Sequence, residues 1–104
     1  MPIESHAKIL VVEDDATVRN LVLTALEAQS FDLLAESTGR GAIASAATNA
    51  PDVVLLDLGL PDIDGIEVVR AIRVWSQMPI IVVSARSEDA DKIAALDAGA
   101  DDYL

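Results

Sequence analysis

The chain has 104 residues, which is the length of one compact domain. Its 18 acidic residues against 7 basic ones give a net charge of −11, so the chain by itself is disfavoured as a binder of nucleic acid or anionic membrane. It has no cysteine, which excludes a disulfide scaffold and any thiolate metal site.

The chain begins with a polar tail over residues 1–7, without the basic and apolar regions of a signal peptide. No apolar run approaches the roughly 18 residues of a membrane span, so we expect a cytoplasmic protein with no membrane partner. The run Lys8–Val12 is apolar after Lys8 and does not alternate, which predicts a strand buried on both faces of a parallel sheet. A helix is predicted from about Ala16, with Asp15 as its N-cap. Its apolar residues recur at helical spacing on one face: Val18, Leu21, Val22, Ala25 and Leu26.

The middle of the chain continues the alternation of strand and helix patterns. Phe31–Ala35 is a weaker apolar run, typical of an edge strand. An Ala-rich helix is predicted from about Gly41 to Thr48, before Pro51. The run Val53–Leu56 predicts a second buried strand, and a third helix is predicted after the Asp64-Gly65 turn.

The last part of the chain predicts a strand at Ile80–Val83 and a fourth helix. This helix is predicted to run from an N-cap at Ser87 to Ala98, with Gly99 as its C-terminal stop. The alternation indicates an α/β fold, a doubly wound parallel sheet of flavodoxin-like order 2-1-3-4-5. The sequence stops at Leu104, so we expect the sheet to be truncated within or before its fifth strand. The outer edge of Ile80–Val83 would then be little covered, which predicts self-association.

Acidic residues follow the first and third predicted strands. Glu13 and Asp14 follow the first, and Asp57 follows the third, so neighbouring strands would bring all three carboxylates into one pocket. Such carboxylates raise one another's pKa, and a hard cation such as Mg²⁺ (or Mn²⁺) resolves the conflict. The backbone carbonyl of Gly59 could supply another oxygen, and one carboxylate could act as a nucleophile toward phosphorus. Ser84, at the end of the fourth strand, could donate a hydrogen bond to a phosphoryl oxygen.

Each of these residues also has an ordinary structural interpretation. Asp14 before a helix can serve as a cap, Asp57 can be a turn residue, and Ser84 can bond to the local backbone. Asp62 and Asp64, which flank Pro61 and Gly65, are interpreted as turn residues. The joint occurrence of polar groups at the ends of the first, third and fourth predicted strands favours a functional site.

Four segments together resemble the receiver domain of two-component response regulators, and within that family the OmpR-type subfamily. They occur in the family's order over 8–104: Ile9–Asp15, Leu55–Gly65, Pro79–Ala85 and Leu96–Leu104. The resemblance implies that Asp57 accepts a phosphoryl group and that Glu13 and Asp14 hold Mg²⁺. It implies further that the Gly59 carbonyl is a metal ligand. The remaining implied positions are switch residues, namely the Ser84 hydroxyl and the aromatic Tyr103.

The resemblance also implies partners and an output. A sensor histidine kinase would donate the phosphoryl group, and the domain would act as a switch rather than an enzyme, although it would catalyse its own phosphorylation and dephosphorylation. An OmpR-like parent would dimerise on activation and bind DNA only through a C-terminal domain. That domain, the rest of the last strand, the last helix and the phosphoryl-contacting lysine of the family would all lie beyond Leu104.

Two other functions remain open at this point. One is a stand-alone phosphorelay receiver without an output domain, which only the length of the parent protein distinguishes. The other is a Mg²⁺-dependent phosphatase of the haloacid dehalogenase type, which also uses an Asp at a strand end. That family needs a second Asp two residues after the nucleophile, where this chain has Gly59.

Overall fold

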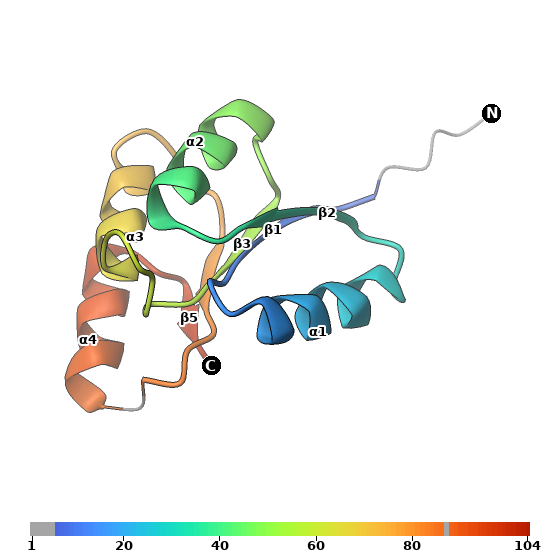
Figure 1. Ribbon diagram of the computed structural model, residues 1–104. Helices are drawn as coiled ribbons and strands as arrows, with labels where there is room; N and C mark the ends of the chain where they lie inside the picture. Colours follow the sequence, from blue (N-terminus) through green and yellow to red (C-terminus); the bar gives the residue numbers. More distant parts are fainter. Residues whose placement is uncertain (1–5, 87) are drawn as a thin grey trace.

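The computed structural model describes residues 6–86 and 88–104, which form a five-stranded parallel sheet in the order β2-β1-β3-β4-β5 (Figure 1). The strands are β1 (Lys8–Val12), β2 (Asp32–Glu36), β3 (Val53–Leu56), β4 (Ile80–Val82) and β5 (Asp102–Tyr103). The predicted fold class and strand order are confirmed. β1 and β3 have the predicted bounds, and β2 is the edge strand that its weaker pattern predicted.

Four helices connect the strands, with α1 on one face of the sheet and the other three on the opposite face (Figure 1). They are α1 (Ala16–Glu27), α2 (Gly39–Asn49), α3 (Gly65–Arg73) and α4 (Asp89–Ala98). Asp15 caps α1 as predicted, because its carboxylate accepts a hydrogen bond from the Val18 amide at 3.0 Å. Gly99 ends α4 in the left-handed conformation, with φ of 117°.

Two helix starts differ from the sequence prediction. α2 begins at Gly39 rather than about Gly41, because Thr38 caps it through a 3.0 Å hydrogen bond from the Gly41 amide to the Thr38 hydroxyl. α4 begins at Asp89 with Glu88 at the N-cap position. The predicted cap Ser87 lies outside the described residues.

The hydrophobic core lies between the sheet and helices α2 to α4. Alternate strand residues point into it and are fully or almost fully buried: Leu10, Val12, Val54, Leu56, Ile80 and Val82. The opposite face of the sheet is covered less. No residue of α1 is buried, and Leu21 on its predicted apolar face is 67% exposed. The prediction of the helix is therefore confirmed, but its apolar face is only partly buried, because α1 is the one helix of the described residues on that side.

The outer edge of β4 is paired with β5, so the expectation of a little-covered edge is wrong. The Asp101 amide donates to the Ile80 carbonyl and the Leu104 amide donates to the Val82 carbonyl, each at 2.8 Å. The chain thus forms its fifth strand with two residues, Asp102 and Tyr103. None of the helices in the described part of the chain is long and apolar enough to cross a membrane.

Candidate functional site

The site lies at the carboxyl ends of β1 and β3, which are adjacent strands. Their register pairs Val12 with Leu56, so the next residues, Glu13 and Asp57, leave the sheet side by side. Backbone hydrogen bonds hold both positions. The Asp57 amide donates to the Val12 carbonyl, and the Glu13 amide donates to the Glu36 carbonyl, both at 3.0 Å. The strand order and register therefore place Glu13 and Asp57 next to each other.

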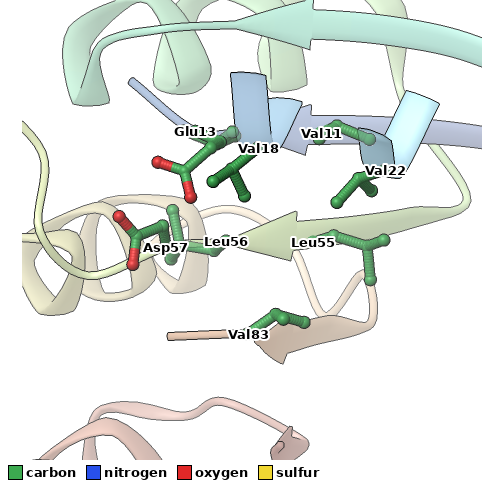
Figure 2. A pocket seen from close by; sticks show the side chains of 9 residues that line it. Val11, Glu13, Val18, Val22, Leu55, Leu56, Asp57 and Val83 are labelled. Carbon is green, nitrogen blue, oxygen red and sulfur yellow. The ribbon is translucent and has the colours of Figure 1, made fainter. Parts of the chain in front are cut away.

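Glu13, Asp14 and Asp57 form one acidic cluster. Each offers a carboxylate oxygen, and these three oxygens lie within 4.8 Å of one another. Asp14 is exposed, whereas Glu13 and Asp57 are half-buried. Glu13 and Asp57 line a cavity of about 50 Å³, whose other walls are apolar side chains such as Val11 and Leu55. Figure 2 shows the carboxylates of Glu13 and Asp57 at the same end of this cavity.

The electrostatic consequence appears at Glu13. Burial, with the hydrogen bond and negative charge of Asp14 and the charge of Asp57, raises the pKa of Glu13 to about 7. A hydrogen bond from the Asp15 amide to the Glu13 carboxylate at 3.2 Å opposes this shift without cancelling it. The charged form of Glu13 is therefore disfavoured in the cluster, as expected where carboxylates lie close together.

The donor set fits a hard divalent cation. Its ligand atoms are carboxylate oxygens, and the exposure of Asp14 leaves room for the water ligands that Mg²⁺ retains. Gly59 lies beside the cluster, because a Cβ placed on it would be 3.6 Å from Oδ2 of Asp57. A carbonyl oxygen at this position matches the same chemistry.

The loop that carries Asp57 and Gly59 is anchored at its far end. Asp62 accepts hydrogen bonds from the Gly39 and Arg40 amides at 2.8 and 2.9 Å, which ties the loop to the first turn of α2. Asp64 caps α3 through the Ile66 amide at 2.9 Å. From their sequence context, both aspartates are interpreted as turn residues, and neither the bonds of Asp62 to α2 nor the cap of Asp64 on α3 is predicted. The Asp62 bonds join residues more than twenty positions apart, which no local pattern reveals.

Ser84 and Tyr103 both form hydrogen bonds with the backbone of Arg86, a residue that the sequence motifs do not single out. The Ser84 hydroxyl accepts a hydrogen bond from the Arg86 amide at 3.2 Å, and the Tyr103 hydroxyl donates to the Arg86 carbonyl. The Arg86 guanidinium donates to both carboxylate oxygens of Asp64, at 2.7 and 3.2 Å. Ser84 and Tyr103 are therefore linked through the backbone of one residue, Arg86, whose side chain is tied to Asp64 at the start of α3.

Comparison with known proteins gives a consistent result. The family model described as "Response regulator receiver domain" matches residues 9–104. The KDP operon transcriptional regulatory protein KdpE of Escherichia coli is 54% identical over 96 residues, which are 92% of this chain and 43% of that protein. The transcriptional regulatory protein KdpE of Mycobacterium tuberculosis is 46% identical, over 92% of this chain and 42% of that protein. The chain thus spans less than half the length of these curated relatives.

The predicted OmpR-type resemblance is confirmed by these relatives. Within that subfamily, the sequence of Trp75-Ser76 and of Asp91–Gly99 resembles the regulator of the Kdp potassium-transport system most, and the similarity to KdpE agrees with this.

Solved structures show the same fold. The receiver domain of Klebsiella pneumoniae RstA, activated with BeF3, superposes with a TM-score of 0.89 at 37% identity, covering 93% of this chain and 83% of that chain. A two-component response regulator from Clostridium difficile gives a TM-score of 0.91 at 28% identity, covering 95% and 82%.

Proposed function

This chain belongs to the response regulator receiver domain family, and from that premise we propose that Asp57 accepts a phosphoryl group from a sensor histidine kinase. The observation that carries the proposal is the acidic cluster, in which Glu13 and Asp14 lie within 4.8 Å of Asp57 at adjacent strand ends. Carboxylates around a nucleophile repel an anionic phosphoryl donor unless a cation is bound among them. A carboxylate nucleophile beside a bound cation is an arrangement that phosphoryl transfer uses.

Mg²⁺ (or Mn²⁺) would be held by Glu13, Asp14, Asp57 and the Gly59 carbonyl, and when bound it would neutralise charge on the phosphoryl oxygens. The chain's own part is the nucleophile. A carboxylate oxygen of Asp57 forms a bond to phosphorus while the bond from phosphorus to the donor's imidazole nitrogen breaks, and that nitrogen keeps the electron pair. The product is an acyl phosphate on Asp57.

The proposed response of the domain runs through Arg86. The Ser84 hydroxyl accepts a hydrogen bond from the Arg86 amide and is free to donate its own proton to a phosphoryl oxygen. Movement of Ser84 toward Asp57 would pull on the backbone of Arg86, whose carbonyl accepts the hydrogen bond from the Tyr103 hydroxyl. The surface around α4 and β5 would change in consequence, so that the charge of a phosphoryl group on Asp57 alters a surface away from the site.

The proposed output follows the relatives, which are named as transcriptional regulators. We propose that the parent protein dimerises on activation and binds DNA through a C-terminal domain, since the net charge of −11 makes this chain itself unsuited to DNA. In this role the chain is a switch whose chemistry is confined to its own Asp57, not an enzyme with an external product.

Intact-mass analysis with acetyl phosphate as the donor tests the proposal. The wild type should gain one phosphoryl group in Mg²⁺ and none in EDTA, and Asp57→Asn should gain none in either condition. Asp97→Asn, at an exposed position of α4, is the matched control and should behave as the wild type. Modification of Asp57→Asn at the wild-type rate would show that another residue is the acceptor.

A further inference from the structure

Arg19 of α1 contacts the main chain of the acidic cluster. Its guanidinium Nη1 donates one hydrogen bond to the Glu13 carbonyl at 2.8 Å and another to the Asp14 carbonyl at 3.3 Å. Arg19 is half-buried, and its bond to Glu13 is partly shielded from water, whereas the bond to Asp14 is exposed. The side chain thus holds the backbone of the two residues that supply carboxylates to the cluster with Asp57.

These residues need such a contact because the cluster repels itself. Three carboxylate oxygens lie within 4.8 Å of one another, and the repulsion favours opening of the segment between β1 and α1. The Glu13 amide bonds the Glu36 carbonyl, which fixes the start of the segment. Asp14 is exposed, and its carbonyl has the Arg19 guanidinium as a donor. A charged donor that binds both carbonyls opposes the opening.

The packing of α1 makes this contact more important. No side chain of α1 is buried, and Val18 and Leu21 are 43% and 67% exposed. The helix is therefore held to β1 less by apolar burial than a typical core helix is. The polar contacts at its first turns, the Asp15 cap and the Arg19 bonds, set the position of the helix relative to the Glu13-Asp14 segment.

We propose that Arg19 is a positioning residue for the cation site: by binding the Glu13 and Asp14 carbonyls, it holds their carboxylates in the arrangement that converges on Asp57. The role rests on the proposed function, because it assumes that the cluster binds Mg²⁺. Arg19 contacts neither the carboxylates nor the reacting atoms in its hydrogen bonds. Loss of Arg19 should therefore weaken cation affinity without removing the nucleophile.

The test compares Arg19→Gln with Arg70→Gln, which removes the same charge from an exposed position on α3 where Arg70 pairs with Glu67. Mn²⁺ binding by electron paramagnetic resonance measures cation affinity directly, and acetyl phosphate labelling over a Mg²⁺ series measures the half-saturating concentration and the maximal rate. For Arg19→Gln we expect affinity to fall roughly 10-fold, as for other residues that orient metal ligands. The maximal rate in saturating Mg²⁺ should stay near that of the wild type. Arg70→Gln should match the wild type in both.

Two further measurements separate positioning from simple stability. Urea unfolding in EDTA shows whether Arg19→Gln is folded, and Arg19→Lys, which keeps the charge and one donor nitrogen, should recover part of the affinity. An Arg19→Gln variant that loses stability but binds Mn²⁺ as the wild type does would refute the positioning role while leaving the proposed function intact. A wild type that binds no Mn²⁺ and needs no Mg²⁺ would refute the proposed function and this role with it.

Discussion

Glu13→Gln should stabilise the fold in the absence of metal, because it removes the carboxylate that the cluster accommodates least well. Burial raises the pKa of Glu13 from its ordinary value of 4.5 to about 7, with Asp14 and Asp57 adding to the shift. A carboxyl whose pKa is higher in the folded chain stabilises the fold when protonated. That contribution is complete below the unfolded pKa and is lost as pH rises through the folded pKa.

The size of the effect follows from the shift. A pKa of about 7 in the folded chain against 4.5 in the unfolded chain corresponds to at most about 3 kcal/mol of destabilisation above pH 7. Because Glu13 is only half-buried, solvent screening reduces this, and we expect about 1–2 kcal/mol. Glutamine keeps the size and the hydrogen-bonding capacity of protonated glutamate, so Glu13→Gln should recover that amount at about pH 8 and almost none at about pH 4.

Urea unfolding followed by circular dichroism, in EDTA and then in excess Mg²⁺, measures the difference. Glu27→Gln, an exposed position in the last turn of α1, controls for the change in net charge. Mg²⁺ should stabilise the wild type more than Glu13→Gln, since the stability added by a cation that binds only the native state increases with the logarithm of its affinity. A difference between Glu13→Gln and the wild type that does not change over this pH range in EDTA would refute the reasoning.

Three other changes test separate parts of the structure. Asp14→Ala should reduce the rise in melting temperature that Mg²⁺ produces, and an unchanged rise would show that its carboxylate does not hold the cation. Arg73→Met should lower the free energy of unfolding by about 3 kcal/mol in urea, because a side chain 12% exposed donates to the Gly99 and Met78 carbonyls and to Asp101. A loss below about 0.5 kcal/mol would contradict that network. Asp62→Asn should destabilise the fold at neutral pH and not in acid. The Arg40 and Gly39 amides lower the pKa of Asp62, so its contribution is present above the unfolded pKa and is lost as pH falls through the folded one. Equal losses at both pH values, measured by urea unfolding, would contradict this.

The strands and the acidic cluster could be predicted because they depend on local runs and on strand order. Continuous apolar residues define Lys8–Val12 and Val53–Leu56, and a parallel order that makes them neighbours brings Glu13 and Asp57 together without further information. The contacts that support the cluster could not be predicted in the same way. Asp62 binds amides of α2, which precede it in the chain by more than twenty residues. No spacing rule indicates such a pair.

The exposure of α1 could not be predicted either, for a different reason. The spacing of Val18, Leu21 and Val22 correctly predicted a helix, because periodicity reports which residues share a face. It does not report how much of that face a neighbour covers. Coverage depends on which other elements lie on that side of the sheet, and in the described part of the chain α1 is the one helix there.

Because α1 has no buried side chain, it should open at a lower free energy than the strands and the helices of the core. In amide hydrogen exchange, α1 should then form its own unit and exchange ahead of β1 and β3, whose ladder bonds lie in the core. Opening of α1 would remove the Asp15 cap and the Arg19 bonds and so release the Glu13-Asp14 segment while the sheet remains folded. A cation held by that segment would have to be released at the same time. Cation binding would therefore slow exchange selectively in α1, so that among the described helices the one without a buried side chain reports occupancy of the site.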